Sequence, residues 1–255
     1  MNQKALQTLE FYKIIERLTD FAHSEPGKKL CRELVPSSDF HEIVQNQTET
    51  ADAVSRVRMK GSLSFAGVSD VGDSLKRLEI GGSLSAHELL SISGLLTCAA
   101  RAKNYGRHPE SQEIPDDSLD GMFRALEPLT NVNQEITRCI LSEEEIADDA
   151  SPGLRHVRRQ MKITADRVHT QLNSILNSSR TLLQDAVITM RDGRYCLPVK
   201  AEHKSQFPGM VHDQSSTGST LFIEPMAVIK LNNELRELEL QERKEIEMVL
   251  AALSM

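Results

Sequence analysis

Two long stretches with apolar residues at helical spacing, separated by a segment with the pattern of β-hairpins, limit most strongly how this 255-residue chain can fold. The first stretch covers residues 151–180 and begins with Ser151-Pro152, which is typical of a helix start. The second covers residues 225–255. In both, apolar residues recur mostly at steps of three, four or seven, as in helices that pack along a seam. We expect two antiparallel helices, the first about 45 Å long at about 1.5 Å per residue.

The apolar positions differ slightly from a regular seam. Those of the first stretch are Leu154, Val157, Met161, Val168, Leu172 and Ile175, and those of the second are Val228, Leu231, Leu235, Leu238, Ile246, Val249 and Leu253. Two polar residues, Thr164 and Gln171, are predicted at seam positions of the first helix. The apolar spacing is still running at residue 255, without Gly, Pro or a basic last turn, so we expect the second helix to continue in a longer protein.

The segment between the two stretches predicts a small β module. Asp192-Gly193 is a strong hairpin-turn signal between strands at 186–190 and 194–200. Two further strands are predicted at 209–212 and 219–223, joined by a polar turn. The predicted fold is therefore mainly α with a small β module (α+β). It has a helical core at 1–150, long helices at 151–180 and 225–255, and an inserted β-rich segment at 181–224.

The first 150 residues contain the start and stop signals of short helices. Ser85 and Glu88 form a capping box at the start of an apolar helix, and Pro36 ends an earlier helix. Residues 106–120 are rich in acids and proline, and we expect a loop that faces solvent. A second acidic run, at 143–149, precedes the long helix at 151, where negative charge favours the helix start.

Composition and missing motifs exclude several classes of protein. The chain is 39% hydrophobic and 26% charged, has no apolar run of membrane-spanning length and begins without a secretory signal, so we expect a cytoplasmic protein without a membrane partner. Four scattered cysteines and eight histidines show no ligand spacing, and no metal site is expected. The phosphate-binding pattern Gly-x-x-x-x-Gly-Lys-Ser/Thr is absent, as is the Gly-x-Ser-x-Gly elbow. The residues themselves indicate neither an enzyme nor a cofactor.

One serine-rich turn needs a separate interpretation. His212-Asp213 stands beside Ser215 and three further hydroxyl residues, a combination that a nucleophilic enzyme could use. A hydroxyl-rich turn after a strand is the simpler explanation, and we prefer it.

The charge of the chain is unevenly distributed. Overall, 37 acidic residues outnumber 30 Lys and Arg, yet residues 151–180 hold six Lys and Arg against Asp166 alone. Three of these cations, Arg155, Arg159 and Lys162, share one helical face and could neutralise phosphates. The full set of candidate nucleic-acid contacts, chosen by charge alone, is Arg155, Arg158, Arg159, Lys162, Arg167, Arg191, Arg194, Lys200, His203 and Lys204. The alternative is that these cations pair with the acidic second helix across the seam.

Several segments resemble the MutS-two family, bacterial paralogues of the mismatch-repair protein MutS that lack its mismatch-reading domains. They are LEFYKII at 9–15, residues 51–58, LEIGGSLSAHELL at 78–90, RDGRYCLPVK at 191–200 and GMVHDQSSTGSTLFIEPMAVIKLNN at 209–233. The resemblance covers essentially the whole chain, and the last of these segments is its most specific part.

The resemblance implies a helical core and lever with a clamp inserted between the two lever helices. A complete member continues into an ABC-type ATPase that dimerises and uses ATP and magnesium, and usually ends in a small Smr nuclease domain. Its dimer is implied to close around branched DNA, which suppresses recombination, or to split stalled, collided ribosomes. The lever and clamp would grip the polymer and break no bond themselves.

Two functions remain open from the sequence. The arm could grip DNA or ribosomal RNA, which present the same phosphates to the same cations. Alternatively, it could dock on a protein or on a second copy, with its cations merely balancing acidic helices.

Overall fold

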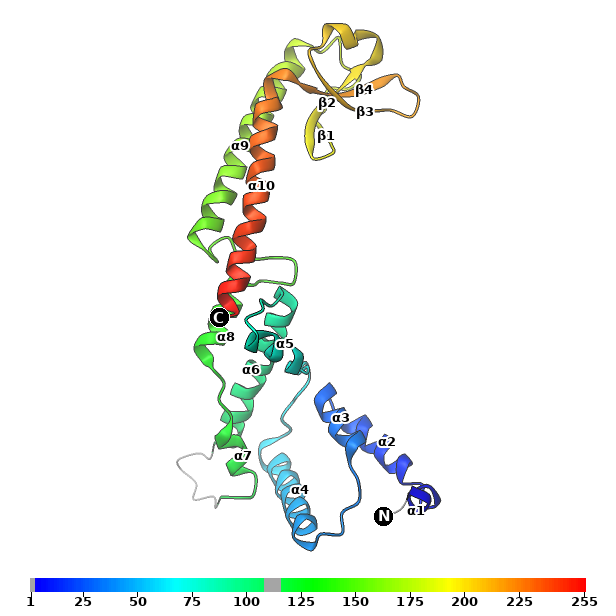
Figure 1. The fold of residues 1–255 in the computed structure, drawn as a ribbon, viewed down its shortest axis with the longest axis vertical. Coiled ribbons are helices and arrows are strands. Elements are labelled where there is room, and N and C mark those ends of the chain that lie inside the picture. The colour runs from blue at the N-terminus through cyan, green and yellow to red at the C-terminus, as the bar shows by residue number, and fades with distance from the viewer. Residues whose placement is uncertain (1–2, 108–115) are drawn as a thin grey trace. The chain divides into compact units, whose positions relative to one another are not determined.

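The computed structural model describes residues 3–107 and 116–255, and it has the predicted fold class, mainly α with one small antiparallel sheet (Figure 1). Eight helices precede the long helix pair: α1 (Gln3–Thr8), α2 (Phe11–Phe21), α3 (Glu25–Glu33), α4 (Phe40–Lys60), α5 (Gly72–Glu79), α6 (Ala86–Gly106), α7 (Asp120–Ala125) and α8 (Thr130–Cys139), counted over the described residues. The chain forms two compact units, one of residues up to 147 with 250–255 and one of residues 148–249.

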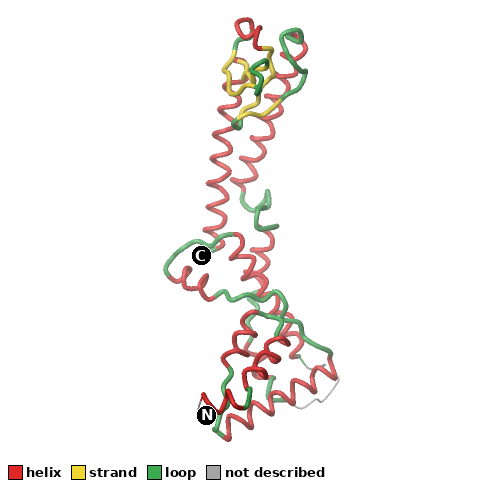
Figure 2. Tube along the Cα trace, turned by 90° about the vertical axis from the view of Figure 1, so that its right-hand side faces the viewer, coloured by secondary structure: helices red, strands yellow, loops and turns green. Residues whose placement is uncertain are grey.

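The two predicted long helices are present as α9 (Pro152–Ser178) and α10 (Met226–Leu253), which lie side by side (Figures 1 and 2). Ser151 caps α9, because its hydroxyl accepts a hydrogen bond of 2.9 Å from the backbone N–H of Leu154. Pro152 follows in the first turn, where a missing N–H has no cost. We call α9 and α10 the helix pair.

The seam of the helix pair buries most of the predicted apolar positions. Its buried residues are Leu154, Val157, Thr164, Val168 and Leu172 on α9 and Val228, Asn232, Leu235, Leu238 and Val249 on α10. The prediction for Thr164 is confirmed: it is fully buried, and its hydroxyl donates to Glu234 of α10 at 3.2 Å. The prediction for Gln171 is wrong, because the burial of Val168 and Leu172, four residues apart, turns the position between them toward solvent.

The β module consists of the four predicted strands and one short 3₁₀ helix. The strands are β1 (Thr189–Arg191), β2 (Arg194–Lys200), β3 (Gly209–Gln214) and β4 (Thr220–Pro225), and η1 covers Ala201–Gln206. They form one antiparallel sheet in the order β1-β2-β4-β3. The predicted Asp-Gly turn is confirmed: Asp192 and Gly193 both have positive φ, 49° and 72°, as the tight hairpin turn requires.

A single apolar cluster joins the β module to the helix pair. Leu197, Val199 and Ile223 of the sheet are fully buried, together with Val168 of α9 and Val228 of α10. These contacts join the sheet to both helices, and the inner strands β2 and β4 are buried on both faces, since Cys196 and Glu224 are buried as well as Leu197 and Ile223. The β module and the helix pair therefore form one body, which we call the arm.

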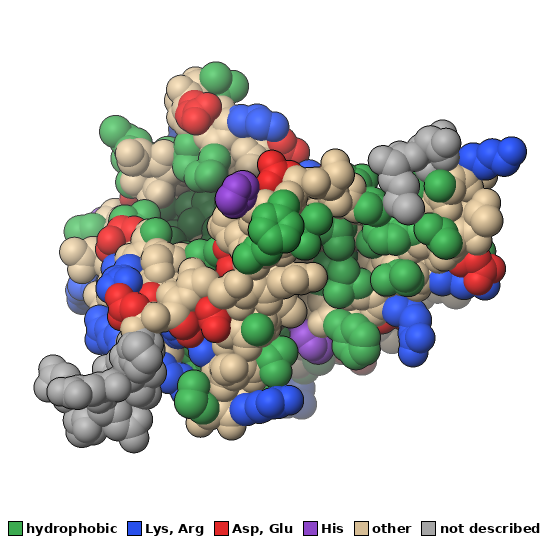
Figure 3. All heavy atoms as spheres, turned by 90° about the horizontal axis from the view of Figure 1, so that it is seen from below, with side chains coloured by type: hydrophobic (Ala, Val, Ile, Leu, Met, Phe, Trp, Pro, Cys, Tyr) green, Lys and Arg blue, Asp and Glu red, His purple; other side chains and the backbone are tan. Residues whose placement is uncertain are grey.

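The other unit has a well-packed part and an open part. α6 begins at the predicted capping box, in which Ser85 and Glu88 satisfy each other's backbone amides, and packs with α7 and α8. Among the described residues before Val71, by contrast, only Arg56 is buried. Phe21 and Phe40 remain 78% and 74% exposed, and hydrophobic side chains are visible among the charged ones at the surface (Figure 3).

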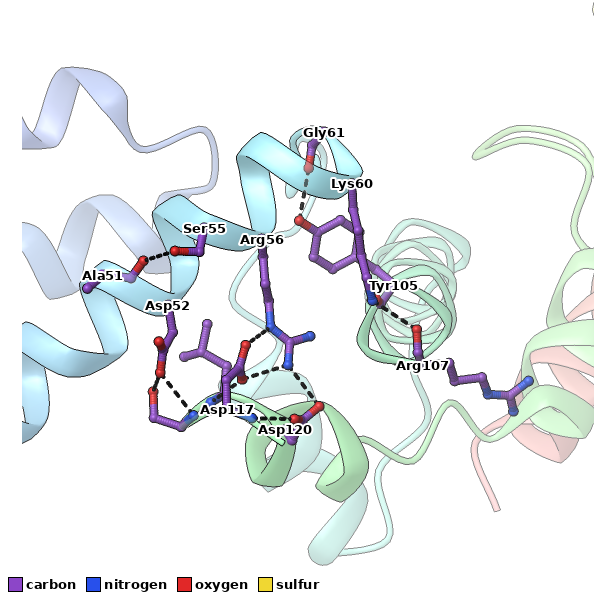
Figure 4. Close-up of polar contacts among 12 residues, drawn as sticks. Ala51, Asp52, Ser55, Arg56, Lys60, Gly61, Tyr105, Arg107, Asp117 and Asp120 are labelled. Atoms are coloured by element: carbon purple, nitrogen blue, oxygen red, sulfur yellow. Dashed lines mark hydrogen bonds and ion pairs between the residues drawn. The ribbon is translucent and has the colours of Figure 1, made fainter. Parts of the chain in front are cut away.

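The end of the predicted acidic loop is not solvent-facing, which corrects the expectation for Asp117 and Asp120. Arg56 of α4 is 2% exposed and binds Asp117 through Nε at 2.5 Å and Asp120 through Nη2 at 2.8 Å (Figure 4). The hydrogen bond with Asp117 raises the pKa of Arg56, and the same bond lowers the pKa of Asp117. The rest of the predicted loop, residues 108–115, lies outside the described residues.

We expect Arg56→Ala to lower the free energy of unfolding by about 3–5 kcal/mol, because it leaves the buried carboxylate of Asp120 without its cation. Arg124→Ala is the control, since Arg124 forms a surface pair with Asp116 at 2.8 Å and exposed pairs contribute about 0–1 kcal/mol. Urea unfolding followed by circular dichroism measures both. Equal losses for the two variants would contradict the structural role of Arg56.

Candidate nucleic-acid interface

The ten predicted basic residues lie on α9 and in the β module, and the structure separates them by what they already bind. Some are held by acids of the chain itself, and others have no partner among the described residues. The distinction matters because a cation already neutralised within the protein must break that interaction to bind a phosphate.

Arg158 is a structural residue. Its Nε lies 2.7 Å from Glu242 of α10, and its Nη1 lies 2.5 Å from Asp148. Partial burial acts to lower the pKa of Arg158, but the hydrogen bonds with Glu242 and Asp148 raise it overall. For this residue, the alternative of charge pairing across the seam is the correct one.

The remaining cations of α9 are far less constrained. Within the described residues, the side chain of Arg155 makes a long, exposed ion pair of 3.8 Å with Asp149 and no other ion pair. Arg159, Lys162 and Arg167 are exposed and have no ion pair or hydrogen-bond partner within the described part of the chain. Because Arg155, Arg159 and Lys162 are three and four residues apart, they share the face of α9 opposite the seam.

The two arginines of the β1–β2 hairpin are both committed to the sheet. Arg191 pairs with Asp213 of β3 at 3.1 Å, and its guanidinium lies 3.8 Å from the ring centre of Phe222. Arg194 binds the buried carboxylate of Glu224 at 3.0 Å. Each guanidinium would have to share or break its ion pair to bind a phosphate.

The last three candidates lie in η1 or directly before it. Lys200 donates a hydrogen bond of 3.3 Å to the backbone carbonyl of Thr181, and the Nε2 atom of His203 lies 3.5 Å from Glu202. Lys204 is exposed, and no partner is found for it within residues 3–107 and 116–255. Lys204 belongs to the β module and the free cations of α9 to the helix pair, so the structure does not collect the ten residues into one cluster.

Sequence reasoning missed a buried, highly connected side chain of the arm, Glu224. Its carboxylate is 1% exposed and accepts hydrogen bonds from Arg194, His212 and Asn232. A charged residue within the apolar strand TLFIEP was the available signal, since a buried carboxylate requires partners.

The serine-rich segment is a structural turn, as expected. His212 binds Glu224 at 2.6 Å rather than a serine. The hydroxyl of Ser215 accepts from the backbone N–H of Thr220, and the hydroxyls of Thr217 and Ser219 bind each other at 2.8 Å. These contacts close the β3–β4 turn and leave no base beside a nucleophile.

Within residues 3–107 and 116–255, no three Asp, Glu, His or Cys side chains gather in an arrangement that could hold a metal ion. The sequence also lacks the glycine-rich loop that binds nucleotide phosphates. In the same residues, no helix combines the length and apolar character needed to cross a bilayer.

Comparison with known proteins identifies the family. No family model matches the chain. It is 59% identical over 260 residues to the "Endonuclease MutS2" of Lachnoclostridium phytofermentans, 56% identical over 256 residues to that of Agathobacter rectalis, and 44% identical over 255 residues to one of Clostridium botulinum. Each match covers 100% of this chain and 32–33% of the relative. The chain belongs to the MutS2 family.

The MutS2 likeness extends over the arm and the helical unit alike, and the chain spans about a third of the length of the curated relatives it matches. The activity in the printed name, endonuclease, is that of those longer proteins. In this MutS2 chain, the residues described above form an arm with internal ion pairs and a few free cations.

We expect Arg158→Ala and Arg159→Ala to differ in stability although the residues are neighbours. Loss of Arg158 leaves the partly buried Glu242 without its hydrogen bond and should cost about 1–3 kcal/mol. Loss of the exposed Arg159 should change stability by less than about 0.5 kcal/mol. Urea unfolding of both variants measures the difference, and equal stabilities would refute the assignment of Arg158 to the seam.

The structure also predicts which cysteine stays unreactive. Cys196 is fully buried, and burial, reinforced by the negative charge of Glu224, raises the pKa of its thiol to about 11. At pH 8 the thiolate that reacts with iodoacetamide is therefore scarce at Cys196. Mass spectrometry of the natively labelled protein should find Cys31, which is partly exposed, modified well before Cys196. Equal labelling rates would show that Cys196 is not buried within the sheet as described.

Proposed function

We propose that this chain supplies the arm with which a MutS2-type ATPase grips nucleic acid, by contacts to phosphates that read no sequence. The observation that carries the proposal is that Arg159 and Lys162, on the outer face of α9, have no partner among the described residues. In a chain with more acids than bases, neighbouring acids could have neutralised these two cations as they neutralise Arg158. Free cations one helical turn apart match the spacing needed to contact a phosphate backbone.

The rest of the proposed function comes from the family. The relatives carry the name endonuclease. From the family resemblance, and not from that name, we assign the ATPase with its ATP and magnesium, the Smr nuclease and the homodimer contacts to a longer protein that acts in the cytoplasm. The arm itself grips without breaking bonds. Its target is branched DNA, where it would suppress recombination, or the RNA of stalled, collided ribosomes, since both offer phosphates to the same cations.

A second candidate function, docking on a protein, has one observation in its favour. Arg158, Arg191 and Arg194 are already held by acids of the chain, which removes three of the ten cations from any phosphate surface. Under this alternative the arm would bind a ribosomal protein or a second copy, and crosslinks from the arm would reach protein only.

The first test is a salt titration of binding by the 255-residue chain. Fluorescence anisotropy measures a four-way DNA junction and a linear duplex, and co-sedimentation measures ribosomes. A junction preference with affinity falling steeply as salt rises supports a DNA grip. Ribosome binding with little DNA affinity supports ribosomal RNA, and the absence of binding to all three at low salt contradicts a grip by the arm alone.

The second test reverses charge at the free cations. We expect Arg159→Glu/Lys162→Glu to weaken binding and to reduce the salt slope by about one for each phosphate that is no longer bound, hence by about two. Lys204→Glu tests the β module separately. The matched control is Arg17→Glu/Arg101→Glu, which changes the net charge equally at two exposed cations of the other unit that have no described side-chain partner. Equal effects of the two double variants would mean that only net charge matters, and the assignment to α9 would be withdrawn.

A further inference from the structure

A buried carboxylate lies where the β module meets the helix pair. Glu224 lies in β4, two residues before α10 begins, and its side chain is 1% exposed. A carboxylate buried this deeply is stable only when hydrogen bonds replace its lost water. Nη1 of Arg194 at 3.0 Å and Nδ2 of Asn232 at 2.7 Å bind its Oε1 atom, and Nε2 of His212 at 2.6 Å binds its Oε2 atom. The donors come from β2, α10 and β3, so one carboxylate ties three elements to β4.

Asn232 extends the connection from the carboxylate to the end of β2 that continues beyond its pairing with β4. The β2–β4 pairing places Leu197 opposite Ile223, so continuing the register would place Tyr195 opposite Pro225. Proline has no N–H to offer a neighbouring strand, and after Pro225 the chain turns into α10. The side chain of Asn232 takes the place of the missing strand: its Nδ2 donates to the carbonyl of Tyr195 at 3.3 Å, and its Oδ1 accepts from the N–H of Tyr195 at 3.5 Å.

The other helix reaches the same point. The ring of His169, on α9, meets the ring of Tyr195 edge to face with 4.9 Å between centroids. Tyr195 is thus bound by α10 through its backbone and touched by α9 through its side chain. Both helices of the pair therefore contact Tyr195, in addition to the apolar cluster beneath the sheet.

The apolar cluster beneath the sheet does not fix the direction of the sheet as hydrogen bonds do. Hydrophobic contacts are non-directional, so the packing of Leu197, Val199 and Ile223 on the helices restricts the direction of the sheet less strictly than hydrogen bonds do. Hydrogen bonds to one buried carboxylate require fixed distances and angles. Apolar packing therefore holds the β module on the helix pair, and hydrogen bonds are needed to fix its orientation.

We propose that Glu224 and Asn232 form a latch that fixes the direction of the β module on the helix pair. The latch closes through Arg194 and His212 on the sheet side and through Asn232 on the helix side. Opening it leaves the sheet folded over its apolar cluster but lets it rotate on the helices. The latch acts on the conformation of the arm alone, whatever the arm binds.

Distances between two spin labels test the latch directly. The labels are placed by Ser216→Cys in the β3–β4 turn and Gln241→Cys on the exposed side of α10, in a Cys31→Ser background that keeps the three buried cysteines. In the otherwise unchanged chain we expect one narrow distance distribution. Asn232→Ala should broaden it and add a second, shifted population, while far-ultraviolet circular dichroism remains unchanged.

The neighbouring residue provides a matched control. Asn233→Ala removes the same amide from the next position of α10, where the side chain is exposed and has no described partner, and should leave the distribution narrow. Glu224→Gln replaces one carboxylate oxygen, an acceptor, by an amide NH₂ group that faces other donors. This variant should broaden the distribution as Asn232→Ala does. Asp213→Asn is its control on the exposed side of β3.

Two outcomes would overturn the latch. The first is a narrow distribution in Asn232→Ala, equal to that of Asn233→Ala. The second is loss of the circular dichroism of the arm in Asn232→Ala, which would make the network a requirement for folding rather than for direction. If Glu224→Gln alone fails to fold, Asn232→Ala decides the question, since it leaves Arg194 and His212 on the carboxylate.

Discussion

Burial of the apolar seam between α9 and α10 is the interaction on which the arm depends. Each of the two helices buries five residues, and a lone amphipathic helix is only marginally stable in water. The seam also supports the β module, because Val168 and Val228 belong to it and to the cluster under the sheet. Polar contacts along the seam, such as Thr164 with Glu234, then select one antiparallel register among those that apolar side chains alone would allow.

Within the arm, acidic residues determine which basic residues remain available to bind other groups. Glu242 and Asp148 hold Arg158, Asp213 holds Arg191, and Glu224 holds Arg194. The basic residues are thereby divided into cations held by acids of the chain and cations that solvent, or a polyanion, can reach. Charge counts along a sequence overestimate a binding surface for this reason, since they cannot show which cations a distant acid has neutralised.

The parts of the fold that the sequence predicts are those determined by neighbouring residues. The seam follows from helical periodicity, the capping box from Ser85 and Glu88, and the hairpin from Asp192-Gly193. The parts that it does not predict join residues far apart in the chain: Arg56 binds acids 61 and 64 positions later, and Glu224 gathers donors from three elements. Gln171 shows the limit of periodicity itself, because a seam of mixed three- and four-residue steps leaves the positions at its edge ambiguous.

The length of the helix pair has a mechanical consequence. α9 contains 27 residues and so measures about 40 Å. A tilt of about 10° at one end of such a rod moves the other end by about 7 Å. Small rotations imposed on α9 and α10 at their ends far from the sheet would thus appear at the sheet as displacements of several ångströms.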